Sequence, residues 1–449
     1  MHVFGSSGVR GVVNEEVTPA FALSVAQAAG SVLGAPEAAL ARDTRTSGPM
    51  LADAVASGLE SVGIAVRRLG VVPTPGLQAY CEREGVPGVM VTASHNPPEY
   101  NGIKLVGGDG VELTRERLDQ VEAALERGVD LAPWQGVGTG AAVSGAADRY
   151  VDAVRAAVDR ERIAGADLTV AIDPGHGAAS ETSPRLFREL GCRVLTVNAQ
   201  ADGRFPGRDP EPVPENLAGL VGLVRASEAD LGVAHDGDGD RAIFVDESGA
   251  VIEGDAALAA LAAAVLEPED AVVSAVNASQ RLVDVVNAAG ADLRLTPIGS
   301  TYIISAIRDL QAGGRHVSLA GEGNGGIIFP DYRVARDGAY TAARFLELVA
   351  DEPASEVVAD VDVYHNVRRK VRYADDAERA AMLEAVEATA EAADVPLDTT
   401  DGYRLDFGDG WVLARPSGTE PVIRIYAEAR EEERAEALAD RMTRAVESV

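Results

Sequence analysis

One serine of this chain lies in a segment that could bring its hydroxyl to a reacting phosphoryl group. Residues 92–97 have the sequence Thr-Ala-Ser-His-Asn-Pro, and they follow Gly88–Thr92, an apolar run that predicts a buried strand. The hydroxyl of Ser94 would then lie on an exposed turn, where nearby amide groups and His95 could stabilise an added phosphate. A plain turn built on Asn-Pro and Asn-Gly explains the same residues equally well.

A lysine follows ten residues after this serine. Lys104 and Lys370 are the only lysines of a chain whose other basic residues are arginines. An ammonium group can give up its proton when its surroundings lower its pKa, whereas a guanidinium holds its proton. Lys104 therefore suits a general acid or base, although an incidental surface lysine fits the same position.

Three aspartates alternate with glycine between two apolar runs. Asp236, Asp238 and Asp240 stand at i, i+2 and i+4, a spacing that lets three carboxylates fold around one hard cation. An EF-hand loop is excluded, because Arg241 occupies the position that requires glycine and the flanks predict strands. The pattern favours a Mg²⁺ site with room for a phosphate oxygen over a solvated acidic loop.

Two further loops carry groups that suit a phosphorylated sugar. Residues 415–419, Arg-Pro-Ser-Gly-Thr, combine amides, hydroxyls and a guanidinium, and Arg424 follows on the next predicted strand. This combination predicts a phosphate cradle, with a hairpin turn as the alternative. In residues 321–326, Glu322 and Asn324 offer hydrogen bonds to sugar hydroxyls, although a flexible glycine loop explains that segment too.

The elements that must position these loops alternate along most of the chain. Strands are expected at residues 167–172, 231–234, 241–245, 271–275 and 293–295, and helices at 114–127, 183–190, 256–266, 279–289 and 301–310. Such alternation predicts layered α/β units with mostly parallel pairing. The last ninety or so residues instead predict two neighbouring strands, 411–414 and 422–427, and a helix over 431–449, as in a smaller α+β domain. Residues 136–147 and 350–360 are expected to be linkers.

Composition narrows the classes of partner. The chain has 449 residues and a net charge of -31, from 71 acidic and 40 basic residues. Such a surface argues against nucleic acid and against anionic membranes as partners. Cys81 and Cys192 are isolated and fit a reducing cytoplasm, and the first residues do not have the pattern of a signal peptide. The acidic, lysine-poor composition favours adaptation to concentrated salt over an ordinary acidic protein from a GC-rich genome.

Taken in order, these segments resemble the α-D-phosphohexomutase family, which includes phosphoglucomutases, phosphomannomutases and phosphoglucosamine mutases. The motifs that carry the resemblance span nearly the whole chain: residues 4–11, 42–48, 73–76, 92–104, 210–216, 236–241, 321–326 and 415–419. The resemblance implies an α/β protein with three related α/β/α mixed-sheet domains and a smaller C-terminal α+β domain around a central cleft. The expected domains are residues 1–147, 148–247, 248–357 and 358–449.

The resemblance also implies roles for the site residues. Ser94 would be the phosphoserine, and its phosphate would share one Mg²⁺ with Asp236, Asp238 and Asp240. Arg10 and Arg241 would contact the transferring phosphoryl group, Lys104 would be the acid or base, and His95 would support the loop. Glu322 and Asn324 would hold the sugar. The phosphate that does not react would be held by Arg415, Ser417, Gly418, Thr419 and Arg424.

The implied reaction interconverts sugar 1-phosphates and sugar 6-phosphates through a bisphosphorylated sugar, which would also act as activator. Asn324 and Gly326 stand where bacterial members often have Ser and His, as in archaeal members, and phosphoglucosamine mutase is the first expectation. A broad phosphomannomutase/phosphoglucomutase or a phosphopentomutase is the alternative. A non-catalytic phosphosugar-binding protein and a metal-dependent sugar phosphatase are the alternatives from other classes. The protein is expected to be a cytoplasmic monomer or homodimer with a small phosphosugar as its partner.

Overall fold

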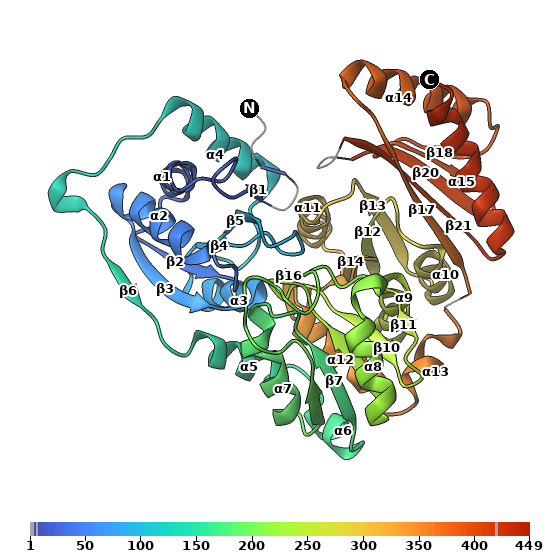
Figure 1. Cartoon of the computed structure of the whole chain (residues 1–449), viewed down its shortest axis with the longest axis horizontal. Helices are drawn as coiled ribbons and strands as arrows, with labels where there is room; N and C mark the ends of the chain where they lie inside the picture. Colours follow the sequence, from blue (N-terminus) through green and yellow to red (C-terminus); the bar gives the residue numbers. More distant parts are fainter. Residues whose placement is uncertain (1–3, 6–7, 362, 418–420) are drawn as a thin grey trace.

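Four β-sheets follow one another along the chain in the computed structural model (Figure 1). The structure describes residues 4–5, 8–361, 363–417 and 421–449. The first three sheets each combine parallel strands with an antiparallel edge, and the described strands of the fourth are antiparallel. This is the α/β architecture expected from the sequence, with three mixed-sheet domains and a smaller C-terminal domain. The domain boundaries given above stay a prediction.

The first sheet runs in the order β1 (Val9–Val12), β5 (Tyr100–Val106), β4 (Gly88–Val91), β2 (Glu37–Arg42), β3 (Ala65–Val71) and β6 (Gly140–Ala142). Its helices are α1 (Pro19–Leu33), α2 (Gly48–Ser61), α3 (Thr74–Glu84) and α4 (Arg115–Arg127), followed by the 3₁₀ turn η1 (Trp134–Gly136). The hydroxyl of Thr18 accepts a hydrogen bond from the amide of Phe21 and so begins α1, which ends at Gly34 in a left-handed conformation.

The second sheet has the order β11 (Val251–Ile252), β10 (Ile243–Asp246), β9 (Leu231–Ala234), β7 (Thr169–Asp173) and β8 (Arg193–Thr196). Its helices are α5 (Ala146–Ala156), α6 (Arg160–Gly165), α7 (Ser183–Glu189) and α8 (Ala218–Ser227), with 3₁₀ turns η2 (Ala178–Glu181) and η3 (Pro214–Asn216). The third sheet has the order β13 (Asp292–Thr296), β12 (Ala271–Ala275), β14 (Val317–Glu322), β15 (Gly326–Phe329) and β16 (Arg333–Arg336). Its helices are α9 (Gly254–Val265), α10 (Gln280–Ala289), α11 (Ser300–Ala312), α12 (Gly338–Val349) and α13 (Ala354–Ala359).

These three sheets share one arrangement at the point where parallel pairing gives way to antiparallel pairing. Strands β4, β9 and β14 are each parallel to an inner neighbour and then turn directly into an antiparallel partner, which is β5, β10 or β15. The strand β4 is buried along its whole length, as a parallel strand covered on both faces must be. The three turns lie at the carboxyl ends of parallel strands, which is where open α/β sheets place their ligands.

The fourth sheet has the order β17 (His365–Arg372), β21 (Val422–Ala429), β20 (Gly410–Pro416), β19 (Tyr403–Asp406) and β18 (Leu397–Asp398). Helices α14 (Asp376–Glu391) and α15 (Glu432–Glu447) belong to this domain. One face of its sheet packs against the third domain, where Trp411 and Leu413 meet Val276. In Figure 1 this domain, in orange and red, lies beside the olive strands and helices of the third domain.

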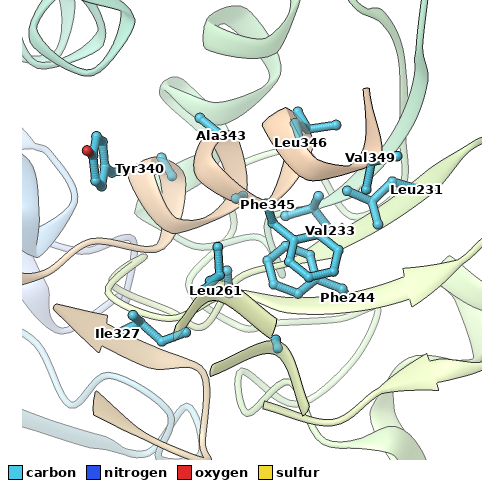
Figure 2. Packing of buried hydrophobic residues seen from close by; sticks show 14 of the residues in the cluster. Leu231, Val233, Phe244, Leu261, Ile327, Tyr340, Ala343, Phe345, Leu346 and Val349 are labelled. Carbon is cyan, nitrogen blue, oxygen red and sulfur yellow. The ribbon is translucent and has the colours of Figure 1, made fainter. Parts of the chain in front are cut away.

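The second and third domains share one hydrophobic core (Figure 2). Helix α12 of the third domain lies across strands β9 and β10 of the second, and the rings of Phe345 and Phe244 stack with their centroids 4.2 Å apart. Leu346 of α12 lies in the same cluster as Leu231 and Val233 of β9. Because apolar area is buried across the boundary, these two domains hold each other in a fixed orientation.

Most expected elements form within a residue or two of their expected bounds, as β4, β9 and β12 show. The two expected linkers are more ordered than predicted. Residues 140–142 form β6, which pairs with β3 at the edge of the first sheet, and α5 already begins at Ala146. Residues 354–359 form α13, because Ala354 and Val358 bury their side chains in the shared core.

Candidate active site

Ser94 occupies the turn between β4 and β5 in a left-handed backbone conformation, with φ of 52°. This conformation is uncommon for a residue with a Cβ, so the surrounding contacts must hold it. Its amide donates to the hydroxyl of Thr92 at 2.8 Å, and its hydroxyl donates to the carboxylate of Asp236 at 2.6 Å. The serine is fully buried, not exposed as the sequence predicted, because its hydroxyl faces the acidic loop of the second domain across the domain boundary.

The three aspartates lie in the turn between β9 and β10 and are buried. One carboxylate oxygen from each of Asp236, Asp238 and Asp240 lies within 4.8 Å of the others. Gly237 lets this loop approach the serine, because a Cβ at this position would lie 2.5 Å from the carbonyl oxygen of Ser94. The glycines between the aspartates therefore serve close packing between two domains as well as the turn itself.

The arrangement of these carboxylates fits a divalent cation. The Oδ1 atoms of Asp238 and Asp240 are buried and have no hydrogen-bond partner. Burial raises the pKa of Asp236 to about 8, and the carboxylates of Asp240 and Asp238 act in the same direction. Buried oxygens that lack partners and repel each other are the donor set that a hard cation such as Mg²⁺ satisfies.

Lys104 reaches this acidic loop from β5. Its ammonium group lies 2.7 Å from the carboxylate of Asp238 and 3.0 Å from that of Asp240. Burial acts to lower its pKa, but the two carboxylates outweigh burial and hold the pKa above its ordinary value. The acid or base role expected from the sequence needs surroundings that lower this pKa, but here the pKa is raised because the carboxylates lie so close.

The other residues expected around the reacting group lie here as well. The Nδ1 atom of His95 lies 2.9 Å from the guanidinium of Arg241 and 3.4 Å from the hydroxyl of Ser94. Burial, followed by the charges of Arg241 and Arg10, holds the pKa of His95 well below its usual range, so the imidazole is neutral. Arg10 donates to the side chain of Asn96 at 3.0 Å and is half-buried beside the same loop.

The loop with Glu322 and Asn324 adjoins the acidic loop. The amide of Ala242 donates to the carbonyl of Gly325 at 3.0 Å, which joins the two loops directly. Glu322 is buried, and Asn324 donates to its carboxylate at 3.4 Å. These two side chains therefore lie next to the carboxylates of the acidic loop, as expected for residues that serve one site.

A residue that the sequence argument missed also joins these two loops. Arg336 donates to Asp240 at 2.7 Å and lies 4.0 Å from the carboxylate of Glu322. Its side chain fills the space beside Gly326, where a Cβ would come within 2.6 Å of the Arg336 stem. The only signal in the sequence is an arginine next to an aspartate at the end of an apolar segment, which does not indicate such a role.

The expected phosphate cradle lies on the fourth sheet. Arg415, at the end of β20, is half-buried and forms an ion pair with Asp401 at 3.0 Å. In the β-sheet register Arg415 stands opposite Arg424, which stands opposite Lys370, so three cationic side chains form a row on one face. The amide of Ser417 donates to the carbonyl of Val422 across the hairpin at 2.9 Å. Two further expected contacts, Gly418 and Thr419, lie outside the described residues.

The structure therefore divides the expected residues into two groups. The first three domains bring together Ser94, His95, Lys104, Arg10, Arg241, the three aspartates, Glu322 and Asn324. Arg415, Ser417 and Arg424 belong to the fourth sheet and are joined through Asp401 to the third domain, since Asp401 accepts the amide hydrogen of Ile298 at 3.0 Å. A buried centre with a row of cations on a separate sheet suits a reaction on a substrate that carries phosphate at a second position.

Family comparisons agree with this division. Residues 1–130, 148–249 and 253–364 match the three alpha/beta/alpha domains, I, II and III, described for phosphoglucomutase/phosphomannomutase, and residues 367–445 match its C-terminal domain. A phosphoglucomutase/phosphomannomutase of Thermococcus kodakarensis is 42% identical over 446 residues, with 96% of each chain covered. A probable phosphoglucosamine mutase of Methanopyrus kandleri is 40% identical, covering 97% of this chain and 96% of the other.

Solved structures show the same architecture. A phosphoglucomutase/phosphomannomutase family protein from Burkholderia thailandensis superposes with a TM-score of 0.87 at 28% identity, covering 99% of this chain and 97% of the other. The four matched domains and the relatives identify a mutase, an isomerase that moves a phosphoryl group within a sugar phosphate. The chain belongs to the phosphoglucomutase/phosphomannomutase family, the α-D-phosphohexomutases. Over the residues that the structure describes, none of the helices has both the length and the apolar character to span a membrane.

Proposed function

We propose that this mutase works through a phosphorylated Ser94. The observation that supports this best is the buried contact between the Ser94 hydroxyl and Asp236, at 2.6 Å, inside a ring of charged groups from three domains. In the proposed cycle, phosphoserine gives its phosphoryl group to the free hydroxyl of a sugar monophosphate. The bisphosphate that forms turns end for end, and its other phosphate returns to Ser94. A sugar bisphosphate would therefore also load a serine that had lost its phosphoryl group.

The metal ligands in this proposal are the phosphorylated Ser94, Asp236, Asp238 and Asp240. A bound Mg²⁺ would supply charge stabilisation to the oxygens of the transferring group. The unpartnered oxygens of Asp238 and Asp240 support this assignment. The remaining work falls to side chains of the protein, which must orient the phosphoryl group, move one proton and keep water away.

Three basic groups surround the position of the reaction. Arg241 and Arg10 would hold the phosphoryl oxygens, because Arg241 contacts His95 and Arg10 contacts Asn96 in the Ser94 loop. Lys104 would move the proton of the attacking or leaving sugar hydroxyl, because an ammonium gives up its proton more readily than the neighbouring guanidiniums do. His95 accepts a hydrogen bond from Arg241 and would keep that guanidinium aimed at the serine.

The substrate would be held at both ends. Glu322 and Asn324 would accept and donate hydrogen bonds to the sugar hydroxyls, because they lie beside the acidic loop. Arg415, Ser417, Gly418, Thr419 and Arg424 would hold the phosphate that does not react. Since this cradle is on a separate sheet, it would grip either phosphate while the reacting centre stays in place.

For the sugar itself we favour glucosamine phosphate. The relative from Methanopyrus kandleri carries the name probable phosphoglucosamine mutase, and the loop around Asn324 and Gly326 has the residues that the sequence argument associated with archaeal members. The second candidate is a broad phosphoglucomutase/phosphomannomutase, which the name of the Thermococcus kodakarensis relative favours.

The test is conversion of glucosamine, mannose, glucose and ribose 1-phosphates to their isomers, with Mg²⁺, concentrated KCl and a trace of sugar bisphosphate. Ser94→Ala is assayed alongside. We expect isomerisation of at least one sugar by the wild type and none by the variant, and the fastest sugar identifies the substrate. Release of inorganic phosphate without isomerisation would instead indicate a phosphatase. Binding without any turnover would indicate a phosphosugar-binding protein.

A further inference from the structure

Arg45 lies in the segment between β2 and α2, and its side chain is fully buried. A buried guanidinium is costly unless every N–H group finds a partner, because its charge leaves water. The proposed reaction does not use this arginine. The role of this buried charge must therefore follow from the groups that it contacts.

All of the guanidinium donors of Arg45 are occupied. A guanidinium has five N–H donors in a planar fork. Its Nε donates to the carboxylate of Asp43 at 3.1 Å. The other donors reach the backbone carbonyls of Ser94 at 3.0 Å, Asn96 at 2.6 Å, Pro97 at 2.6 Å and Tyr100 at 2.9 Å. One side chain thus ties together the whole turn that carries the serine.

The backbone amide of Ser94 is held by Asp43 and Thr92. The Asp43 oxygen that accepts from Arg45 also accepts the hydroxyl hydrogen of Thr92 at 2.6 Å, and that hydroxyl accepts the Ser94 amide at 2.8 Å. Arg45 therefore fixes the carbonyl of Ser94 directly, and it fixes the amide through Asp43 and Thr92. With both peptide groups held, the left-handed conformation of Ser94 is imposed by its surroundings.

Residues of the second domain cover the guanidinium of Arg45. The ring of Phe205 lies over the guanidinium of Arg45 at 5.1 Å, and Arg45 pairs with Gly203 in an isolated β-bridge. The adjacent Thr44 donates its hydroxyl hydrogen to the carbonyl of His176 at 2.9 Å. These contacts cover the guanidinium of Arg45 and join the Ser94 turn to the domain that carries the aspartates.

We propose that Arg45 is the positioning residue of phosphoryl transfer: its guanidinium sets the orientation of the Ser94 turn, so that the serine oxygen faces Asp236. This role rests on the proposed function, in which Ser94 carries the phosphoryl group. A lysine cannot replace this arginine, because an ammonium has three donors and lacks the planar fork that reaches the turn carbonyls. A displaced serine slows transfer, whereas the distant phosphate cradle still binds substrate.

The experiment compares wild type, Arg45→Lys and Arg333→Lys, each with a measured unfolding midpoint. Arg333 is a matched control, because it is also a buried arginine in an interdomain contact, with Glu82 at 2.9 Å. We measure kcat and KM with the sugar phosphate that wild type isomerises. We also measure the rate at which a sugar bisphosphate phosphorylates Ser94, by intact-protein mass.

For Arg45→Lys we expect kcat and the phosphorylation rate of Ser94 to fall about 10- to 100-fold, the cost of a misplaced reacting group. We expect KM to stay within about twofold, since binding at the cradle is intact. Arg333→Lys should keep both rates within about twofold. A folded Arg45→Lys protein with wild-type rates overturns the role of Arg45, and so does an equal loss of rate in Arg333→Lys.

Thr92→Val keeps the inference testable if Arg45→Lys does not fold. This variant preserves the side-chain volume and removes the link from Asp43 to the Ser94 amide. We expect a lower kcat with an unchanged KM, and unchanged kcat in the folded variant would overturn the inference. A wild type that neither isomerises a sugar phosphate nor becomes phosphorylated at Ser94 overturns the proposed function itself. An active wild type with an equally active Arg45→Lys protein overturns only the positioning role.

Discussion

The Ser94 centre is enclosed by three domains, whereas Arg415 and Arg424 of the cationic row are half-buried, and Lys370 is exposed, on a sheet that contacts the third domain. The serine turn is held by a guanidinium on one side and by the acidic loop on the other. The fourth sheet is attached at a different place, where the buried Glu428 accepts hydrogen bonds from Trp411 at 2.9 Å and from the amide of Gln280 at 2.9 Å. Fixed geometry is therefore concentrated where bonds would change, whereas the second phosphate site is a separate part of the protein.

The largest effect is expected from neutralising one member of the acidic loop. Asp236→Asn should lower kcat by about 10²- to 10³-fold, because it removes a ligand of the Mg²⁺ that would stabilise the charge of the reacting phosphoryl group. The same change should raise the unfolding midpoint of chelator-treated protein, since it relieves repulsion among three buried carboxylates. Steady-state kinetics and thermal unfolding in a chelator check both. Asp53→Asn, at an exposed carboxylate, should change neither, and a lower midpoint for Asp236→Asn would contradict the repulsion argument.

A pH effect should follow from Asp255, which faces Arg368 across the boundary between the third and fourth domains. Burial raises its pKa to about 6 from an ordinary value of 3.8. The folded protein therefore binds this proton more tightly than the unfolded chain, so its contribution to stability is lost as the pH rises from about 4 through 6. At neutral pH the cost is on the order of 2–3 kcal/mol.

Asp255→Asn removes this cost, so the variant should gain more stability relative to wild type at pH 7.5 than at pH 4.5. Unfolding midpoints of both proteins at the two pH values provide the measurement. An equal difference at both pH values would show that Asp255 keeps an ordinary pKa. Such a result would also mean that the contact between the third and fourth domains is not buried enough to change the pKa of Asp255.

A smaller effect is expected at the cationic row. Arg415→Ala should raise KM about 10-fold with little change in kcat, because it removes charge-assisted hydrogen bonds to a phosphate that does not react. Arg430→Ala serves as the control, since that arginine is exposed on the same domain and pairs with Asp284. A fall in kcat without a change in KM would mean that the fourth sheet takes part in the chemistry itself.

Salt should stabilise the folded protein through small contributions from many surface charges. The net charge of -31 predicts that the unfolding midpoint rises from millimolar to molar KCl, because screening weakens the repulsion among carboxylates. Buried pairs such as Lys104 with Asp238 are screened little, so the gain should come from the surface. Thermal unfolding across a KCl series measures this. A midpoint that does not move would refute the salt adaptation inferred from composition.

Local patterns predicted the chemistry of single loops and the order of the elements. The i, i+2 and i+4 spacing of the aspartates was sufficient to expect three carboxylates around one point, which is how they lie. The apolar run before Ser94 likewise indicated β4, because a continuous run of buried residues is typical of a parallel strand. In these cases the information lies within a few neighbouring residues.

The residues that sequence reasoning missed act over long separations. Arg45 contacts carbonyls about fifty residues further along the chain, and Arg336 contacts Asp240 from 96 residues away. No period or spacing encodes such pairs, because Arg45 reaches its carbonyls through the packing of the first domain and Arg336 reaches Asp240 across a boundary between two domains. The pKa of Lys104 was misjudged for the same reason, since its direction depends on two carboxylates from another domain.

The shared turn of the first three sheets has a consequence for how this site could arise and change. One strand–turn–strand unit occurs at β4–β5, β9–β10 and β14–β15, and in the proposed function each copy would supply a different part: a nucleophile, an acidic cluster and a group of sugar contacts. Triplication of a single ancestral unit is enough to produce this plan, with later divergence confined to a few turn residues. If the proposed roles hold, substrate range would vary in the third copy while the first two keep the phosphoryl chemistry unchanged.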